Sequence, residues 1–427
     1  MISLKDSTVY FDTDEGNGLL LDIYRDEQIL DSQRERLKDA INEFSRLFGA
    51  DAIEIYSAPG RTEIGGNHTD HQHGEVLAGA INRDAVAIVS PRDDGKIRII
   101  SKGYNKAIEV DAAPKPKDPR LAGTSTALVN GVIAHLSECG FNTGGFNAYV
   151  TSNVLSGSGL SSSAAFETLI GSIISGLYNN MRIHPTQIAI TGQYAENEYF
   201  GKPCGLMDQM ASSTGGLVHI DFRNPADPVV EKIEAEFEKS GYCLCITDTK
   251  GSHADLTPDY AAIPAEMKSV AALHGKEVLI DVSFDDILAN INLIREKAGD
   301  RALLRAIHFF EENKRAHIEA EAVKAGNFES FLRIFKESAR SSFEYLQNVY
   351  PPSDISRQNT SVALALSELI LRENGAARIH GGGFAGTIQA FVKIDKAAEY
   401  KKHIDAVFGP DSCSILYIRK FGGMKIL

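Results

Sequence analysis

Residues 151–167 read TSNVLSGSGLSSSAAFE, and this stretch decides the fold. The residues just before it, 146–150, are β-prone, and the small residues from Ser161 onward predict a helix. Gly157 and Gly159 allow the backbone to turn tightly and to approach a ligand without an intervening Cβ. A helix start offers N–H donors and the positive end of a dipole, which together suit a phosphate. The stretch therefore predicts a phosphate-binding loop, although Gly/Ser runs before helices also occur as plain turns and caps.

Two other readings of this loop are disfavoured by its spacing. The common P-loop pattern, Gly-x4-Gly-Lys-Ser/Thr, does not occur in the chain. A serine hydrolase would present its nucleophile in a Gly-x-Ser-x-Gly elbow, and that pattern is also absent.

The composition is that of an ordinary soluble globular protein, with 43% hydrophobic and 24% charged residues. A length of 427 residues favours two domains. The net charge of -13 argues against a nucleic-acid or anionic-membrane partner. The N-terminal residues do not resemble a signal peptide, and no apolar run approaches the roughly 20 residues that span a bilayer. Five scattered cysteines without a C-x-x-C pair favour a reducing cytoplasm over a disulfide framework or zinc site.

Local patterns predict several elements around the loop, while residues 1–27 give no firm pattern. The predicted helices are one that begins at the capping box Ser32-Gln-Arg-Glu35 and ends at Gly49, then 126–139, 185–200, most of 285–347, and 361–372. The predicted strands are 52–57, a hairpin of 85–90 with 96–101, then 216–222 and 242–248, where Cys243 and Cys245 read as packing residues. We place the change of domains at the charged segment 231–239, which divides the chain into 1–230 and 231–427.

The segment APGRTEIGGNHTDHQHGEVLAGAI, residues 58–81, is unusually polar for a connection between apolar stretches. Its histidines at 68, 71 and 73 with Asp70 could bind a metal, although their spacing matches no established zinc pattern. A solvated polar loop is a second reading. The third is a pocket in which carboxylate, amide and imidazole groups hydrogen-bond a hydroxylated ligand.

Two further stretches point to a ligand. Asp208 lies in GKPCGLMDQMAS, among apolar residues and glycines, where an acid is either functional or the N-cap of the next helix. Residues 379–386, IHGGGFAG, form a second glycine-rich loop between a predicted helix and the strand TIQAFVKI, which suggests close backbone approach to something.

Four stretches in this order resemble the GHMP family of small-molecule kinases, and within it the galactokinases. PGRTEIGGNHTDHQHGEVL is similar to the signature P-G-R-x-N-x-I-G-E-H-x-D-Y-x-x-G-x-V-L, and GSGLSSSAAFE is similar to the family's phosphate loop. AENEYFGKPCGLMDQ resembles A-E-x-x-x-x-G-x-P-C-G-I-M-D-Q, and RIHGGGFAGTIQAFV resembles the C-terminal loop S-R-M-T-G-G-G-F-G-G. The matches span residues 58–392. The resemblance implies a two-domain α+β GHMP kinase fold with the active site in the interdomain cleft.

The resemblance also implies roles for residues at matching positions. Asp208 falls on the acid that faces the reacting sugar hydroxyl, and Arg61 falls on the arginine that pairs with it. The implied Mg²⁺ ligands are Ser163 and Glu196. The implied nucleotide phosphate loop consists of Ser156, Gly157, Ser158, Gly159, Leu160, Ser161, Ser162 and Ser163. The implied sugar contacts are Asn67, His68, Asp70, Gly205 and Tyr260.

Several positions depart from the galactokinase pattern. Asn67 replaces the signature glutamate that holds the sugar's distal hydroxyl, and Glu63 replaces an asparagine. Further replacements are Gly65 for isoleucine, His71 for tyrosine and Ala385 for glycine, and the segment NVYPPSDISRQN does not resemble the family's S-C-P-E-x-D stretch.

We therefore expect an ATP- and Mg²⁺-dependent sugar-1-kinase that acts on galactose as a cytoplasmic monomer. The alternatives are the same reaction on an N-acetylhexosamine, a pentose or a uronic acid, and a non-catalytic sugar sensor. The intact GSGLSSSAA loop favours an enzyme over a sensor.

Overall fold

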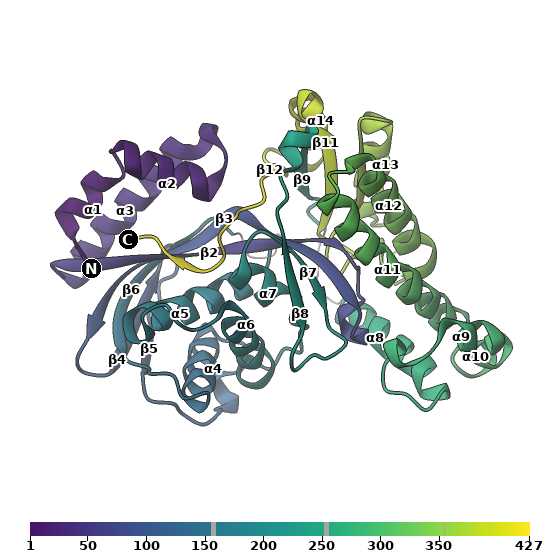
Figure 1. Ribbon diagram of the computed structural model, residues 1–427, viewed down its shortest axis with the longest axis horizontal. Helices are drawn as coiled ribbons and strands as arrows, with labels where there is room; N and C mark the ends of the chain where they lie inside the picture. The colour runs from purple at the N-terminus through teal and green to yellow at the C-terminus, as the bar shows by residue number, and fades with distance from the viewer. Residues whose placement is uncertain (155–158, 252–255, 354) are drawn as a thin grey trace.

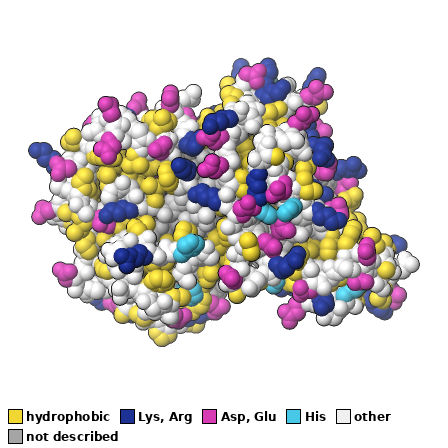
Figure 2. All heavy atoms as spheres, viewed as in Figure 1, with side chains coloured by type: hydrophobic (Ala, Val, Ile, Leu, Met, Phe, Trp, Pro, Cys, Tyr) yellow, Lys and Arg dark blue, Asp and Glu magenta, His cyan; other side chains and the backbone are white. Residues whose placement is uncertain are grey.

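The computed structural model describes residues 1–154, 159–251, 256–353 and 355–427. The chain alternates helices and strands and forms two separate β-sheets, one in each half of the sequence (Figure 1). Among these described residues, no helix is long and apolar enough to cross a membrane. On the face shown in Figure 2, basic and acidic side chains are interspersed and form no continuous basic surface.

The first sheet has the strand order β1-β2-β3-β6-β4-β5, with β13 beside β2 and with β7 and β8 continuing from β3. Its strands are β1 Ile2–Ser3, β2 Ala52–Gly65, β3 Glu75–Arg92, β4 Lys96–Ser101, β5 Ile108–Asp111, β6 Gly145–Ser152, β7 Leu217–Asp221, β8 Val229–Ile233 and β13 Met424–Lys425. The long strand β3 pairs with β7 along its first part and with β6 along its second. One strand thereby joins the two ends of the sheet.

The predicted hairpin of 85–90 with 96–101 is wrong, because β6 lies between these two strands. Ile88 on β3 is opposite Tyr149 on β6, and Ile99 on β4 is opposite Ala148 on the other side of β6. The β6 segment is apolar and largely buried, so it is stabilised by strands on both of its edges. The short connection after Arg92 looks like a hairpin turn in sequence, but the two strands that it joins, β3 and β4, are separated in the sheet by β6.

Helices cover both faces of the first sheet (Figure 1). They are α1 Leu4–Tyr10, α2 Asp14–Tyr24 and α3 Leu30–Phe48 on one face, and α4 Ser125–Glu138, α5 Ser162–Asn179, α6 Pro185–Tyr194 and α7 Met207–Thr214 on the other. The predicted stop at Gly49 is confirmed by its left-handed conformation, φ 62°. The predicted capping box is wrong. The helix begins at Leu30, and the Ser32 hydroxyl donates to the Ile29 carbonyl at 2.8 Å.

The second sheet has the order β10-β11-β9-β12, and most of its strands are flanked by helices of the C-terminal half. Its strands are β9 Tyr242–Asp248, β10 Gly375–Ile379, β11 Thr387–Lys393 and β12 Cys413–Leu416. The helices are α8 Thr257–Leu273, α9 Phe284–Ala289, α10 Ile291–Lys297, α11 Asp300–Lys324, α12 Phe328–Ser341, α13 Asn359–Leu371 and α14 Ile394–Phe408. The predicted strand at 242–248 and the helical region 285–347 are confirmed. Cys243 and Cys245 are buried, as packing residues should be.

Short helical turns connect several of these elements. The 3-10 turns are Glu27–Ile29, Asp70–Gln72, Pro119–Leu121, Phe237–Ser240 and Leu279–Asp281, and the π turns are Ala195–Phe200 and Ser342–Leu346.

The two sheets change over between Ile233, the end of β8, and Tyr242, the start of β9. We therefore keep the proposed domain division near residue 231, with one amendment at the C-terminus. Strand β13 returns to pair with β2, and the Leu427 carbonyl accepts a hydrogen bond from Ile55 N at 2.9 Å. Residues 424–427 belong structurally with the first sheet.

Candidate active site

Arg61 and Asp208, which lie 147 residues apart in sequence, form a bidentate ion pair. Arg61 Nε donates to Asp208 Oδ1 at 2.6 Å, and Arg61 Nη2 donates to Asp208 Oδ2 at 2.7 Å. Arg61 lies within β2, which continues to Gly65 instead of giving way to a loop at residue 58. Asp208 lies in the first turn of α7 and is not its N-cap, because Leu206 holds that position. A strand and a helix therefore fix the two partners.

The electrostatics of this pair favour an ionised carboxylate. Burial alone would raise the pKa of Asp208, but the Arg61 guanidinium outweighs burial and holds that pKa below its usual value. The Ser161 hydroxyl also donates to Asp208 Oδ2. Arg61 Nη1 donates to the Gly159 carbonyl at 2.6 Å. The end of the glycine-rich loop is thus tied to both members of the pair.

The structure describes part of the predicted phosphate loop. Ser156, Gly157 and Ser158 lie outside the described residues. Gly159 and Ser161 both have left-handed backbones, with φ 71° and 55°, and α5 begins immediately afterwards at Ser162. The side chain of the N-cap residue, Ser161, makes no capping hydrogen bond within the described residues, so the first N–H groups of α5 can face an anion.

The loop also contacts the second half of the chain. A Cβ on Gly159 would lie 2.5 Å from Thr387 Oγ1 and 3.3 Å from His380 Nδ1, so only glycine fits there without displacement. The Arg61–Asp208 pair and the loop therefore lie where the half of the chain that forms the first sheet meets the half that forms the second.

Two buried carboxyl groups, Glu167 and Glu196, lie next to this pair. The Gln209 amide Nε2 donates to one oxygen of each, at 3.0 Å in both cases. The Ser163 hydroxyl lies 3.4 Å from Glu196 Oε1, and Lys202 Nζ donates to the same oxygen at 3.0 Å. Burial, followed by the charge of Glu196, raises the pKa of Glu167 well above its ordinary value. Glu167 Oε1 is buried and has no hydrogen-bond partner among the described residues.

This donor set fits a hard cation. It offers carboxylate and hydroxyl oxygens, which Mg²⁺ prefers, and two neighbouring carboxyl groups that a positive charge would stabilise together. The ammonium of Lys202 already pairs with Glu196 at this point.

The predicted sugar contacts divide into two groups. Asp70 and Gly205 lie together, because a Cβ on Gly205 would come within 2.1 Å of Asp70 Oδ2. His68 Nε2 lies 3.1 Å from the Gly382 carbonyl, and Tyr260 donates its hydroxyl to the Gly383 carbonyl at 2.8 Å. His68 and Tyr260 thus hold the second glycine-rich loop. Burial, with the neighbouring His71 ring, lowers the pKa of His68 to about 4, so this ring is neutral at physiological pH.

Asn67 does not present a free amide to a ligand, contrary to our expectation of a direct sugar contact. Its side chain is fully buried. Its Nδ2 donates to Glu63 Oε1 at 2.9 Å and to the Gly381 carbonyl at 2.8 Å, and its Oδ1 accepts from Asn348 Nδ2 at 2.9 Å. Asn67 is therefore an internal link between the signature segment and the second glycine-rich loop.

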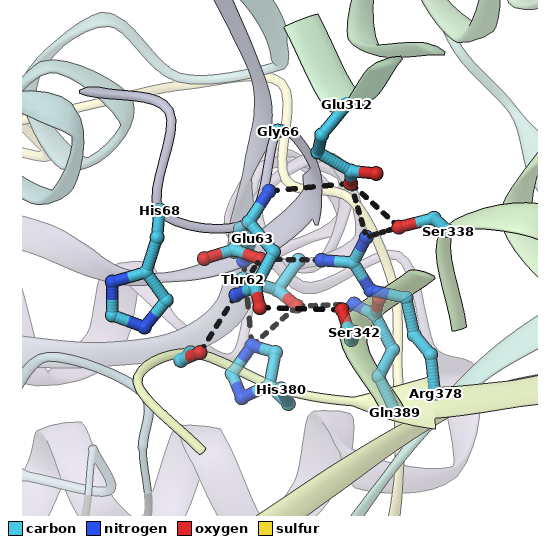
Figure 3. Close-up of polar contacts among 12 residues, drawn as sticks. Thr62, Glu63, Gly66, His68, Glu312, Ser338, Ser342, Arg378, His380 and Gln389 are labelled. Atoms are coloured by element: carbon cyan, nitrogen blue, oxygen red, sulfur yellow. Dashed lines mark hydrogen bonds and ion pairs between the residues drawn. The ribbon is translucent and has the colours of Figure 1, made fainter. Parts of the chain in front are cut away.

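The Asn67 amide donates to a buried polar network that includes Glu63 and Arg378, shown in Figure 3. Glu63 accepts from Arg378 Nη2, and Arg378 Nη1 donates to Ser338 Oγ at 2.9 Å. The Ser338 hydroxyl donates to Glu312 Oε1 at 2.6 Å. Burial raises the pKa of Glu63 to about 7 in spite of Arg378 and Asn67. By contrast, the opposing charge of Arg315 is the main influence that outweighs burial at Glu312 and lowers its pKa to about 2.

Three of the signature departures meet in this network. Glu63 and Asn67 are exchanged relative to the signature's asparagine and glutamate, and they hydrogen-bond each other. Gly65 replaces isoleucine, and a Cβ there would lie 1.9 Å from Glu319 Oε2. The three departures therefore lie together, where the end of β2 and the residues just after it pack against helices of the C-terminal half.

The alternative of a metal site at 68, 71 and 73 with Asp70 is not supported. Within the described part of the chain, the only group of three or more histidine, cysteine or acidic side chains close enough to share an ion is Glu75, His219 and His317.

Sequence reasoning missed Lys202, Gln209 and Glu167 around Glu196, and Arg378 behind the signature. Lys202 and Gln209 lie within GKPCGLMDQ, and Glu167 ends GSGLSSSAAFE, so the quoted motifs already contained them. Arg378 also lies in a quoted motif, as the first residue of RIHGGGFAGTIQAFV, but its role depends on burial against Glu63, which the motif does not reveal.

Comparison with known proteins agrees with this geometry. The galactokinase galactose-binding signature matches residues 42–91, and the N-terminal domain of GHMP kinases matches residues 127–216. A galactokinase from Streptomyces coelicolor is 30% identical over 365 residues, which cover 86% of this chain and 91% of that protein.

Solved structures give the same answer. The Lactococcus lactis galactokinase complexed with galactose has a TM-score of 0.76 at 25% identity and covers 90% of this chain and 98% of its own. The Methanococcus jannaschii mevalonate kinase, with a TM-score of 0.59 at 17% identity over 86% of this chain and 98% of its own, shares the fold. The predicted two-domain α+β GHMP kinase fold is thereby confirmed. Taken with the sequence match over most of both chains, these likenesses show that the protein belongs to the galactokinase family of the GHMP kinases.

Proposed function

We propose that the protein transfers the γ-phosphoryl group of ATP to the anomeric hydroxyl of galactose or of a closely related hexose. The observation that carries this proposal is the bidentate Arg61–Asp208 pair, tied to the end of the glycine-rich loop through Ser161 and Gly159. The family relationship supports a sugar kinase, and the Streptomyces and Lactococcus relatives are both named galactokinases.

In the proposed reaction Asp208 accepts the proton of the sugar's O1 hydroxyl. O1 then bonds to the γ-phosphorus while the bond from that phosphorus to the β,γ-bridging oxygen breaks, and ADP leaves with the electron pair. An anomeric hydroxyl is more acidic than an ordinary alcohol, so an ionised carboxylate suffices as acceptor. The lowered pKa of Asp208 keeps it ionised at neutral pH, and Arg61 offsets negative charge near the transferred group.

The nucleotide would lie along the glycine-rich loop, with its phosphates at the uncapped start of α5. In this proposal Ser163 and Glu196 hold Mg²⁺, and Lys202 adds positive charge on the same side. An Mg²⁺ ion held there would neutralise negative charge that develops on the phosphoryl group during transfer. The protein's own contribution is to place Ser163 at the first turn of α5 opposite the buried Glu196.

For the sugar, we propose direct contacts from Asp70 and the Gly205 backbone. His68, Asn67 and Tyr260 would act indirectly, since each bonds the backbone of the second glycine-rich loop. One observation favours a second candidate substrate, a hexose modified at its distal end. The carboxylate of the signature's glutamate is absent at position 67, and the carboxyl group of Glu63 contacts buried Arg378 instead.

A coupled ADP-release assay over a panel of aldoses tests this proposal, with Asp208→Asn as the matched control. We expect sugar-dependent ADP release with galactose or a modified galactose, and its near loss in the control. The absence of sugar-dependent ADP release with every aldose would refute the kinase proposal and favour a sugar sensor.

A further inference from the structure

Three potential metal ligands from both halves of the chain meet at residues to which the proposed kinase reaction gives no role. Glu75 Oε2 lies 2.7 Å from His219 Nε2 and 3.1 Å from His317 Nδ1. One ligand atom from each of the three residues lies within 4.8 Å of the others. The side chains of Glu75 and His219 are 17% and 10% exposed, whereas that of His317 is 56% exposed. The cluster is therefore built on a buried base and open to solvent at one side.

The fold places these residues together by strand register. Leu77 on β3 is opposite His219 on β7, and Glu75 lies two residues before Leu77, so Glu75 and His219 project from the same face. His219 is in turn opposite Glu231 on β8. Helix α11 supplies His317, and Asn313 one turn earlier fixes the helix here by accepting the Glu75 backbone N–H at 2.6 Å.

The donor chemistry selects a transition metal over Mg²⁺ or Ca²⁺. Two imidazoles and one carboxylate suit Zn²⁺, whereas Mg²⁺ and Ca²⁺ prefer oxygen ligands alone. Tetrahedral Zn²⁺ with bonds near 2.0–2.1 Å holds its ligand atoms about 3.3 Å apart. The two separations from Glu75, 2.7 and 3.1 Å, are a few tenths of an ångström shorter, and the two histidine nitrogens lie within 4.8 Å of each other. The exposed His317 side chain can supply this adjustment by rotation.

A second carboxylate, that of Glu231, lies on the side of His219 that faces away from Glu75. Glu231 Oε2 lies 3.9 Å from His219 Nδ1, the ring nitrogen that does not face Glu75. A histidine that binds a metal through Nε2 carries its proton on Nδ1, and a carboxylate there fixes the ring and raises its basicity. Two carboxylates thus lie at the cluster: Glu75 faces both imidazoles, and Glu231, which also pairs with Lys324, faces His219.

We propose that Glu75, His219 and His317 bind one Zn²⁺ or a similar divalent transition metal ion, with one position left open to solvent. Because Glu75 and His219 lie on the first sheet and His317 lies on α11, the ion connects the two halves of the molecule. The ion would take the place between the two ring nitrogens and Glu75 Oε2, which now contact one another directly. The site is independent of the kinase reaction and of its Mg²⁺.

Equilibrium dialysis of the full-length protein against micromolar ZnSO4, with millimolar Mg²⁺ present to fill oxygen-only sites, tests this proposal. Bound zinc is counted per chain by mass spectrometry. We expect one zinc ion per wild-type chain and a rise in melting temperature on zinc addition. His317→Ala should bind at least tenfold more weakly and lose the thermal shift, while Glu231→Gln should weaken binding by about 10- to 100-fold.

His403→Ala is the matched control, because His403 is also an exposed histidine on a helix of the C-terminal half. It should bind zinc as the wild type does. Failure of the wild-type protein to retain zinc, or equal retention by His317→Ala, would overturn the proposal. His317 lies on the exposed side of α11, so this variant should fold, and its circular dichroism spectrum verifies that.

Discussion

Replacing Asn67 by Asp tests the buried network behind the signature with an almost isosteric change. In the wild type, Asn67 Nδ2 donates two hydrogen bonds, to Glu63 Oε1 at 2.9 Å and to the Gly381 carbonyl at 2.8 Å. The variant puts an oxygen where that nitrogen was. The Gly381 carbonyl loses its donor, Glu63 Oε1 keeps only the bond from Arg378, and a carboxylate faces the carboxyl group of Glu63.

The size of the effect follows from these contacts. A buried polar group left without a partner costs about 1–3 kcal/mol, and because Glu63 Oε1 keeps its hydrogen bond from Arg378, the Gly381 carbonyl alone predicts a loss of that size at pH 7. Burial and the proximity of Glu63 raise the folded-state pKa of the introduced carboxyl above its unfolded value of about 3.9. Relative to wild type, the variant therefore keeps this part of its stability below about pH 3.9. It loses stability as pH rises above that value, by at most about 1.4 kcal/mol per pH unit.

Urea unfolding of both proteins between pH 4 and 8 measures this difference. Asn224→Asp is the matched control, because Asn224 is exposed on the first domain's surface and the same chemical change should cost little there. Equal stability of Asn67→Asp and wild type at pH 7, or a deficit that does not grow with pH, would refute the assignment of Asn67 as an internal link.

Further predictions concern the reacting groups. Asp208→Asn should fold and bind nucleotide normally but lower turnover by about 10²–10⁴, as measured by steady-state kinetics; near-normal turnover would remove Asp208 from the mechanism. Because Arg61 is what holds the pKa of Asp208 down, Arg61→Gln should move the acid limb of the kcat/KM profile to higher pH, and an unmoved limb would contradict that account. Glu196→Gln should raise the Mg²⁺ concentration needed for half-maximal rate, and a changed sugar preference instead would place Glu196 at the sugar. Gly205→Ala puts a Cβ 2.1 Å from Asp70 Oδ2 and should lower kcat/KM for the sugar by up to about 10²-fold, with the KM for ATP unchanged.

Local elements of the fold were predictable where one segment decides its own structure. The strand Tyr242–Asp248 and the left-handed stop at Gly49 follow from local pattern and glycine chemistry. The pairing of β3 and β4 was not predictable in this way, because β6 enters the sheet between them from about fifty residues further along the chain. The return of β13 to β2 likewise depends on tertiary contacts that a two-residue strand cannot signal.

The candidate site likewise has features that the sequence shows and features that only tertiary packing reveals. Arg61 and Asp208 could be paired from sequence only through the family motifs, since nothing local relates positions 147 residues apart. The departures at Glu63, Gly65 and Asn67 were visible, but their coupling through Arg378 and Glu319 was not. A residue aligned with a sugar contact can be fully buried, and only the packing of the second half of the chain reveals this.

The position of the transferred phosphate tests the central claim most directly. A ¹H–³¹P correlation spectrum of the product formed from ATP and the preferred hexose identifies the sugar proton that couples to phosphorus. We predict a correlation to the anomeric proton H1, because the phosphate is placed on the anomeric oxygen. A main correlation to H3, H4 or the H6 methylene, or no sugar phosphate formed together with ADP, would contradict the account.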